Sequence, residues 1–166
     1  MGVEDRLRTQ VGELFARYGR EVTELAYFMT GDLHVGQDIA QEAFVRLFGR
    51  FGHVRNPDAV RAYLRKTVVN LARSHFRRRR SERAYLRKVA GDTVRGVESD
   101  VHSWDDDTFA LLQGLPHKQR AALILRFYFD LSEHQTAEIL DVTPKAVNGL
   151  VTRGLNSVRE RYRADG

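Results

Sequence analysis

The fold is decided by one stretch of the sequence, SEHQTAEILDVTPKAVNGLVTRGL, at residues 132–155. It opens with a capping box, in which Ser132 accepts a hydrogen bond at a helix start and Gln135 returns one. Thr143 followed by Pro144 marks a second helix start, because proline fits the first helical position. The stretch therefore predicts two helices joined by a three-residue turn.

The residues between these two helices are those of a helix-turn-helix. Ala137 is small enough for close approach, and Val142, Val147 and Leu150 fill the wedge between the helices. Asp141 stands four residues after Ala137, where glycine is usual because the backbone often adopts a left-handed conformation there. In the helix-turn-helix of DNA-binding proteins, the second helix enters the major groove.

The second helix carries a polar face opposite its apolar stripe. That face is formed by Lys145, Asn148, Gly149, Thr152 and Arg153. Asparagine can bind adenine through two hydrogen bonds, while lysine and arginine contact guanine or phosphate. A plain helical hairpin with a solvated polar face would show the same periodicity, so the pattern alone leaves both interpretations open.

Apolar residues recur at helical spacing through most of the remaining chain, without the alternation of strands. Helices are predicted over 4–30 and 34–50, and a third begins at Asn56-Pro57 and runs into four consecutive arginines. The first helix has an apolar stripe that we expect to be buried, formed by Leu7, Val11, Leu14, Phe15, Tyr18, Val22, Leu25 and Ala26. Another core helix is predicted from Ala121, Leu123, Ile124, Leu125 and Phe127.

Residues 92–107 lack an apolar period and are rich in glycine, serine and acidic residues. Such a composition is typical of a linker. The sequence therefore predicts an all-α protein of two small helical domains, 1–88 and 108–166, joined by a flexible acidic linker over 89–107.

Composition excludes several classes of function. The chain has no cysteine and six scattered histidines, which excludes a thiolate metal site and offers no converging metal ligands. It has neither an apolar run of membrane-spanning length nor a secretory signal, which predicts a cytoplasmic protein without membrane insertion. The net charge of +5 is weak evidence for a polyanionic partner.

Two polar faces stand out in the N-terminal domain. On the second predicted helix, Asp38, Gln41, Glu42 and Val45 lie at i, i+3, i+4 and i+7, beside Arg46. This face could simply be solvated. On the third, a basic face with the same spacing ends in four arginines and is formed by Lys66, Asn70, Arg73 and Arg77. A basic stripe along one helix is a plausible track for nucleic-acid phosphates.

The chain resembles the extracytoplasmic-function (ECF) sigma factors. Residues 38–47, DIAQEAFVRL, resemble their D-x-x-Q-E-x-F-x-R-L signature, and residues 62–74, AYLRKTVVNLARS, resemble the helix that follows it. LPHKQR at 115–120, together with the helix-turn-helix, matches the second family domain. TGD at 30–32 and VNLARS at 69–74 are most similar to the sigma-E-like group of actinobacteria.

The resemblance implies roles for the first domain, called σ2 in this family. It binds the clamp helices of the polymerase β′ subunit and melts the promoter −10 element. The implied polymerase-binding residues are Asp38, Gln41, Glu42 and Arg46. The implied DNA-binding residues are His53, Arg55 and Asn56 around a flipped base, and Lys66, Asn70, Arg73 and Arg77 along the strand and upstream duplex.

The second family domain, σ4, sits on the polymerase β flap and reads the −35 element. Its implied base or phosphate contacts are Lys145, Asn148, Thr152 and Arg153. The resemblance implies no enzymatic activity, no catalytic residue and no cofactor, because polymerase supplies the active site and magnesium. The implied partners are core polymerase and promoter DNA, which would associate the protein with the nucleoid in holoenzyme. Many relatives also bind an anti-sigma factor and others lack one, so that partner stays open.

Two other functions compete with this interpretation. A polymerase-independent helix-turn-helix regulator would explain the C-terminal domain, but it leaves the 38–47 motif and the basic helix unexplained. A nuclease would need clustered carboxylates for metal, and the cluster Asp105-Asp106-Asp107 lies in the predicted linker.

Overall fold

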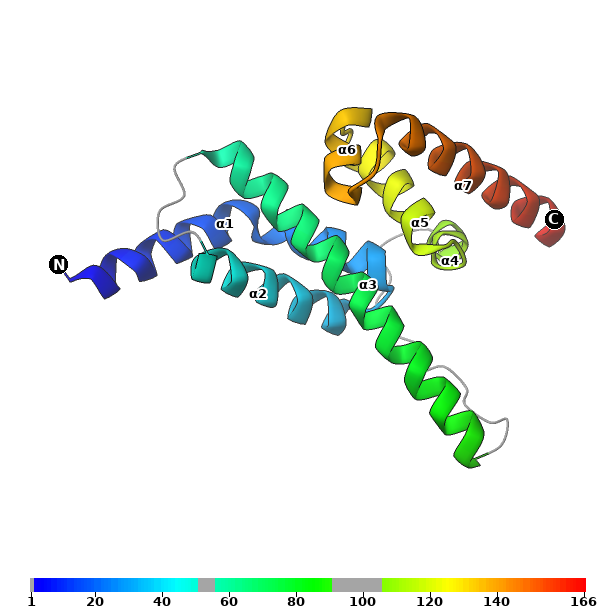
Figure 1. Ribbon diagram of the computed structural model, residues 1–166, viewed down its shortest axis with the longest axis horizontal. Coiled ribbons are helices and arrows are strands. Elements are labelled where there is room, and N and C mark those ends of the chain that lie inside the picture. Colours follow the sequence, from blue (N-terminus) through cyan, green and yellow to red (C-terminus); the bar gives the residue numbers. More distant parts are fainter. Residues whose placement is uncertain (1, 51–55, 91–105) are drawn as a thin grey trace.

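The structure is a computed structural model that describes residues 2–50, 56–90 and 106–166 (Figure 1). All of its regular elements in these ranges are helices, as the sequence predicts. They are α1 (Val3–Thr30), α2 (Leu33–Arg50), α3 (Pro57–Ala90), α4 (Asp106–Gln113), α5 (His117–Leu123), the π-helix η1 (Ile124–Tyr128), α6 (Glu133–Leu140) and α7 (Pro144–Asp165).

Helices α1, α2 and α3 form the first bundle around an apolar core. Leu25, Leu47 and Leu64, one from each helix, are fully buried. Two glycines permit the close crossing of α1 and α2. Gly31 ends α1 at a φ of 76°, and a Cβ at Gly36 would lie 2.9 Å from the backbone nitrogen of Tyr27. Only glycine fits such an approach without displacing backbone.

The predicted apolar stripe of α1 is wrong in its N-terminal half. Leu7 is 42% and Phe15 is 49% exposed, whereas Tyr18 and the stripe residues after it are buried. The first turns of α1 project beyond the ends of the other helices of the bundle (Figure 1). Phe15 still contacts Phe44 of α2, with ring centroids 5.2 Å apart, and Leu14 is partly buried against the core. The stripe is therefore covered only in part here, and periodicity alone overstated the core.

Helices α4 to α7 form the second bundle, and the predicted helix-turn-helix caps are confirmed. Gln135 N donates to Ser132 Oγ over 3.1 Å, and Ser132 N donates to Gln135 Oε1 over 2.9 Å. Thr143 Oγ1 accepts from the amide of Ala146 over 3.1 Å. Asp141 adopts the left-handed conformation, with φ 55° and ψ 48°.

The predicted core position of Phe127 is wrong, because its side chain is 63% exposed. The helix loosens there into the π-helical turn η1, in which the amide of Phe129 donates to the carbonyl of Ile124 over 3.2 Å. A π-turn holds one more residue than an α-turn and therefore shifts the following side chains around the helix. An α-helical period cannot anticipate this shift.

The helices extend two residues into each end of the predicted 89–107 linker, because α3 continues to Ala90 and α4 starts at Asp106. The rest of that linker lies outside the described residues. None of the helices in the described part of the chain is both long and apolar enough to span a membrane.

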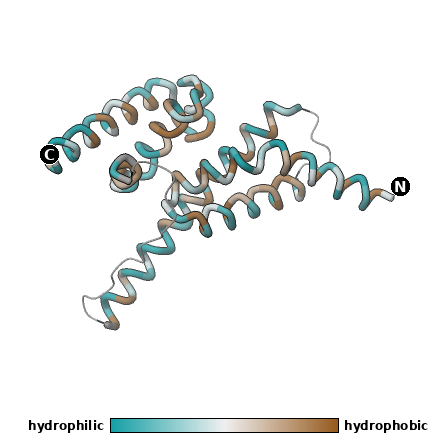
Figure 2. The backbone as a smooth tube through the Cα atoms, turned by 180° about the vertical axis from the view of Figure 1, so that it is seen from behind, coloured by the Kyte–Doolittle hydropathy of each residue, from teal (hydrophilic) through white to brown (hydrophobic). Residues whose placement is uncertain are grey.

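The two bundles touch each other. The Tyr27 ring of α1 stacks on Phe109 of α4 with centroids 5.1 Å apart, and Phe28 meets Tyr128 edge-on at 4.6 Å. Figure 2 shows hydrophobic residues gathering where helices face one another. The buried side chains of both bundles thus form one continuous apolar cluster.

Candidate polymerase and DNA interfaces

The inner face of α2 packs into the core of the bundle, where Ala43 and Leu47 are fully buried. This packing fixes the direction in which the outer face of α2 points. The four residues predicted to bind polymerase are all exposed, namely Asp38, Gln41, Glu42 and Arg46. Glu42 accepts a hydrogen bond from Arg46 Nε over 3.1 Å, and both side chains are about half exposed. A surface pair of this kind contributes at most about 1 kcal/mol to stability.

Val45 lies within this charged face and is 64% exposed. A single exposed valine needs no explanation by itself. Together with flanking carboxylates at helical spacing it forms a small apolar spot with a polar rim, which is the usual composition of a protein-binding surface.

The basic face of α3 lies opposite the fully buried Leu64 and Val68. Its members are all exposed, and they are Lys66, Asn70, Arg73 and Arg77. They span about 16 Å of helix, given a rise of about 1.5 Å per residue. Within residues 2–50, 56–90 and 106–166 none of these cations forms an ion pair, so their charge is available to a ligand.

The predicted base-capturing loop is described only at its end. His53 and Arg55 lie outside the described residues. Asn56 caps α3, because its Oδ1 accepts a hydrogen bond from the amide of Asp58 over 3.0 Å. The structure therefore gives Asn56 a local role that the Asn-Pro start signal already indicated.

Val147 of α7 is fully buried against the rest of the second bundle. Its packing fixes the orientation of α7, so that the polar face points outward. All four predicted −35 contacts are exposed, and they are Lys145, Asn148, Thr152 and Arg153. Arg153 folds back along the helix, since a Cβ added at Gly149 would lie 3.0 Å from its Nη1. The glycine leaves room for this arginine to reach toward the N-terminal end of α7.

Sequence reasoning missed the buried Arg120 of α5. Its Nη1 donates to the carbonyl of Met29 in α1 over 2.6 Å, and its Nη2 donates to the carbonyls of Gln113 and Leu115 over 2.6 and 3.1 Å. Its guanidinium carbon lies 4.9 Å from the ring centre of Phe76 in α3. An arginine followed directly by an apolar run was the signal available in the sequence.

Burial sets the charge of the groups at this junction. It lowers the pKa of Arg120 to about 10, so the guanidinium stays positive at neutral pH. Burial also lowers the pKa of His117 to about 4, and the nearby cations Arg120 and Arg73 add to that effect. His117 is therefore neutral at neutral pH and packs as an aromatic ring 6.3 Å from that of Phe76.

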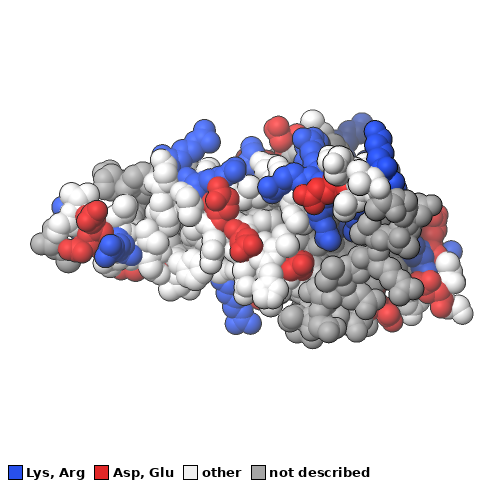
Figure 3. Space-filling model, turned by 90° about the horizontal axis from the view of Figure 1, so that it is seen from below, with Lys and Arg blue, Asp and Glu red and all other residues white. Residues whose placement is uncertain are grey.

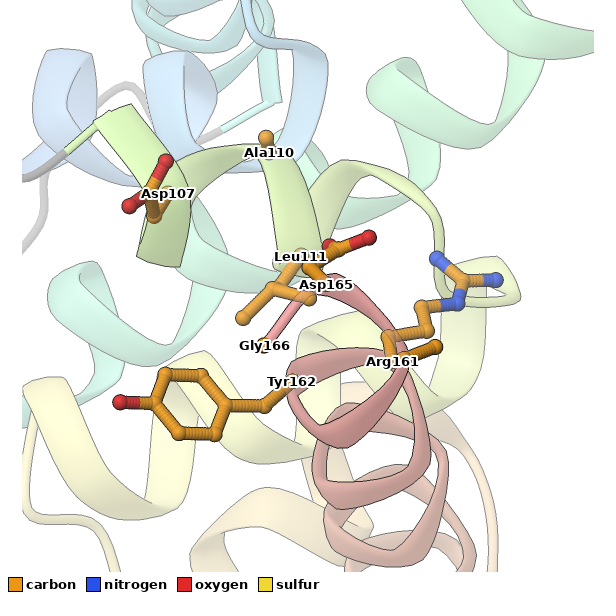
Figure 4. A pocket seen from close by; sticks show the side chains of 8 residues that line it. Asp107, Ala110, Leu111, Arg161, Tyr162, Asp165 and Gly166 are labelled. Atoms are coloured by element: carbon orange, nitrogen blue, oxygen red, sulfur yellow. The ribbon is translucent and has the colours of Figure 1, made fainter.

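A hollow between α4 and the end of α7 is lined by two carboxylate residues, Asp107 and Asp165, whose side chains lie apart in Figure 4. Arg161 at its rim donates to the carbonyl of Gly114 over 2.7 Å. The described residues contain no group of three or more histidine, aspartate or glutamate side chains that could hold a metal ion. Two carboxylates without a third ligand or a nearby base give this hollow no support as a hydrolytic site.

Comparison with known families assigns both bundles. The family model Sigma-70 region 2 matches residues 14–82, which fall on α1 to α3. The model Sigma-70, region 4 matches residues 108–158, which fall on α4 to α7. The chain belongs to the sigma-70 family. The ECF sigma factor predicted from the 38–47 motif is thereby confirmed, as is the predicted pair of helical domains.

The curated relatives that this sigma factor resembles are themselves named RNA polymerase sigma factors. It is 27% identical to the RNA polymerase sigma-E factor of Streptomyces avermitilis over 124 residues, which are 75% of this chain and 69% of the relative. It is 24% identical to the ECF RNA polymerase sigma factor SigW of Bacillus subtilis, covering 88% of this chain and 85% of SigW. The match to the probable RNA polymerase sigma factor RfaY of Xanthomonas campestris is 28% identical and spans 39% of that protein's length.

Solved structures share the fold of this sigma factor. The sigma factor RpoE of Bartonella quintana, crystallised with the anti-sigma factor NepR, matches with a TM-score of 0.73 at 18% identity, covering 93% of this chain and 98% of RpoE. CnrH, in complex with the cytosolic domain of CnrY, matches with a TM-score of 0.65 at 22% identity over 99% and 100% of the two chains. The shared architecture therefore includes both bundles.

Proposed function

We propose that this sigma factor binds core RNA polymerase and directs it to promoters, with the first bundle acting at the −10 element and α7 at the −35 element. The observation that carries the proposal is the order of the two matched regions, each of which presents an exposed polar helix face anchored in a packed bundle.

The outer face of α2 is the proposed contact with the polymerase β′ clamp helices. Asp38, Glu42 and the exposed Val45 give it both charge and an apolar spot. Binding would cover Val45, while the carboxylates would orient the partner by charge, which is the usual division between core and rim of an interface. The second bundle is the proposed contact with the β flap.

The basic face of α3 is the proposed contact with the non-template strand and the adjoining duplex. Lys66, Arg73 and Arg77 supply charge for phosphates, and Asn70 supplies a hydrogen-bonding amide. His53 and Arg55 remain proposed ligands of a flipped base. On α7, Asn148 is the proposed reader of a base edge.

Under this proposal the protein is not an enzyme and needs no cofactor, because the polymerase performs the chemistry. It would act in the cytoplasm and lie on the nucleoid within holoenzyme. An anti-sigma factor is a further proposed partner. RpoE is seen with one. An apolar groove of about 370 Å³, lined by Phe28, Phe109, Phe127 and Tyr128 among others, opens at the junction of the bundles.

Run-off transcription tests the proposal directly. Core polymerase is incubated with genomic fragments in the presence and absence of the protein, and the transcript ends are mapped. New, discrete start sites that require the protein are the expected result. If no start site appears and the protein alone binds duplex DNA tightly, a polymerase-independent regulator is the better description.

A further inference from the structure

His117 lies where the second bundle meets α3 of the first bundle. It is the first residue of α5, and its ring lies 6.3 Å from that of Phe76 in α3, measured between centroids. The backbone carbonyl of Val69, also in α3, faces the same ring. The surroundings of this histidine therefore depend on the contact between the two bundles.

Both ring nitrogens of His117 are buried at this contact. Neither makes a hydrogen bond of normal geometry within the described ranges, although the Val69 carbonyl lies close enough to favour the protonated ring. A neutral imidazole has one N–H donor and one acceptor to satisfy. Protonation would add a second donor and a full positive charge, and a buried charge without a partner costs far more than a buried neutral polar group.

The charged groups that act on the ring are cations. Arg120 and Lys118 act on it from α5, and Arg73 acts on it from α3. In the view from below, lysine and arginine side chains gather over the middle and right of the molecule, the part in which α3, α4 and α5 lie (Figure 3). The start of a helix carries partial positive charge, which also disfavours a cation at His117. A protonated His117 would therefore be repelled from both sides of the contact.

Separation of the two bundles would change the surroundings of this ring on one side only. It would remove Arg73, Phe76 and the Val69 carbonyl, whereas Arg120 and Lys118 would stay beside the ring on α5. Water would then reach both nitrogens and solvate the charge of the protonated ring. The open molecule therefore binds the proton more tightly than the closed one, and a ligand shifts an equilibrium toward the state that it binds better.

We propose that His117 is an acid-sensitive switch between the two bundles, in which protonation of its ring favours their separation. The inference deepens the proposed function, on which its meaning for transcription rests, because the −10 and −35 sites are proposed to lie on different bundles. The switch itself needs neither polymerase nor DNA, so it can be measured on the protein alone.

The direction of the pH response follows from the two states of the ring. Burial first, and then Arg120 and Arg73, lower the pKa of His117 from the ordinary 6.5 to about 4 in the closed molecule. Above the ordinary value the ring is neutral in both states, and the closed contact keeps its full stability. Below it, the open molecule gains a proton that the closed one lacks. A full return to the ordinary value on opening would raise the ratio of open to closed molecules about 25-fold between about pH 7.5 and pH 5.

His75 of α3 is a second half-buried histidine and serves as the control. Its pKa is lowered by burial and by Arg79 and Arg78, while Asp32 and Glu82 act in the opposite direction. All four of these charged residues belong to the first bundle. Titration of His75 should therefore leave the contact between the bundles unchanged.

Single-molecule energy transfer between dyes on the two bundles tests the switch, because it counts open and closed molecules directly. The chain has no cysteine, so cysteines introduced at the exposed Gln37 of α2 and Asn156 of α7 carry the dyes in the full-length protein. The series runs from about pH 7.5 to pH 5, since carboxylates as a class protonate mainly below that range. Circular dichroism of the same samples follows helix content and separates opening from unfolding.

The expected results differ among four proteins. In wild type, the ratio of open to closed molecules should rise by about tenfold or more toward pH 5 with unchanged helix content, and His75→Gln should follow wild type. His117→Gln takes up no proton at this position and should keep a nearly constant ratio. His117→Lys places a cation there throughout and should be more open than wild type already at the start of the series.

The proposal is overturned by a wild-type ratio that stays constant down to pH 5, or by an equal rise in His117→Gln. A rise that is accompanied by loss of helix content would also overturn it, since acid would then unfold the protein instead of opening it. None of these results affects the proposed function, which run-off transcription with wild-type protein tests at neutral pH. If no promoter-specific start site appears there, the proposed function is wrong, while the pH response of energy transfer is still expected.

Discussion

Asn148 is the residue on which the proposed sequence-specific reading by α7 most depends. It is exposed at the middle of the polar face, one residue after the fully buried Val147. Replacing Asn148 by alanine should remove about 1–3 kcal/mol of discrimination at one base pair of the −35 element. A promoter-library selection with each holoenzyme measures this. Lys145→Ala is the contrasting variant, for which we expect a uniform loss of affinity; an unchanged −35 preference in Asn148→Ala would refute the assignment.

Asp141 occupies a backbone conformation that suits glycine. At φ 55° it lies in the left-handed region, which costs a residue with a side chain about 1 kcal/mol or more. Asp141→Gly should therefore raise the free energy of unfolding by about 0.5 kcal/mol, since the greater freedom of unfolded glycine offsets part of the gain. Asp141→Ala should lower it by about 1 kcal/mol. Urea denaturation of both variants gives the comparison, and equal stabilities would show that the turn holds no strain.

His117 should make stability depend on pH. Its pKa is about 4 in the folded protein, against 6.5 as the ordinary value. Between these values the unfolded chain binds a proton that the folded chain does not, so stability falls as pH drops from 7 to 5. The loss assigned to His117 is about 1–2 kcal/mol.

The matched variant for this effect is His117→Gln, which cannot titrate in that range. Its unfolding free energy should change less between pH 7 and pH 5 than that of wild type. Part of the dependence should persist, because burial and the cations Arg79 and Arg78 also lower the pKa of His75. Identical pH dependence in wild type and variant would contradict the assignment.

Among the helices, α2 is the one where substitutions should change polymerase binding with the least effect on folding stability. Its predicted polymerase face is exposed, and its one ion pair contributes little to stability. Asp38→Lys with Glu42→Lys should weaken binding to core polymerase about tenfold or more, and should change the free energy of unfolding by less than about 0.5 kcal/mol. Glu4→Lys with Glu13→Lys, the same charge change on exposed sites of α1, is the control. Equal affinities for the two double variants would remove the polymerase contact from α2.

The elements also show what the sequence could predict. The starts of α3, α6 and α7 were predictable, because each depends on a side chain and an amide two or three residues apart. The bundle contacts of Arg120 were not, because its acceptor Met29 O lies 91 residues away. The exposure of Phe15 and Phe127 was missed for a related reason. Periodicity reports which side of a helix is apolar, and only the neighbouring elements decide whether that side is covered.

The exposure of the candidate sites could be predicted as far as it follows from helical spacing. The polar faces of α2, α3 and α7 point outward as the sequence indicates, because each opposes a buried stripe. The sequence also predicted that the basic face of α3 runs into the four arginines at 77–80. It did not predict that the helix continues to Ala90, because the arginine run is followed by the predicted linker.

At the scale of the whole molecule, the two bundles are in contact, yet their proposed DNA sites are far apart. The −10 and −35 elements lie about 25 base pairs apart by their names, which is about 85 Å of duplex at about 3.4 Å per base pair. Two touching bundles cannot span that distance, so the proposed function requires them to separate. On the proposed function, the contact seen here is a closed state, and opening it would cost part of the binding free energy.

Arg120 and Gln113 hold this closed state together at the end of α1. Gln113 Nε2 donates to the carbonyl of Phe28 over 2.9 Å, and Arg120 donates to that of Met29. Both carbonyls belong to the last turn of α1, where backbone acceptors lack partners within the helix. Arg120→Leu would leave the carbonyls of Met29 and Leu115 buried without a donor, at a cost of about 1–3 kcal/mol. Separation of the bundles would return the Met29 carbonyl to water.

We therefore expect Arg120→Leu to populate open molecules. The chain has no cysteine, so cysteines introduced at the exposed Gln37 and Asn156 would carry a pair of dyes for energy transfer between the bundles. Transfer should fall in Arg120→Leu, and core polymerase should bind this variant more tightly because less opening remains to be driven. Arg126→Leu is the matched control, since Arg126 donates to the carbonyl of Leu131 over 2.5 Å within the second bundle. If energy transfer is the same in both variants and in wild type, Arg120 does not control the closed state, and the other contacts between the bundles, among them the Gln113–Phe28 hydrogen bond and the aromatic pairs, suffice to hold it.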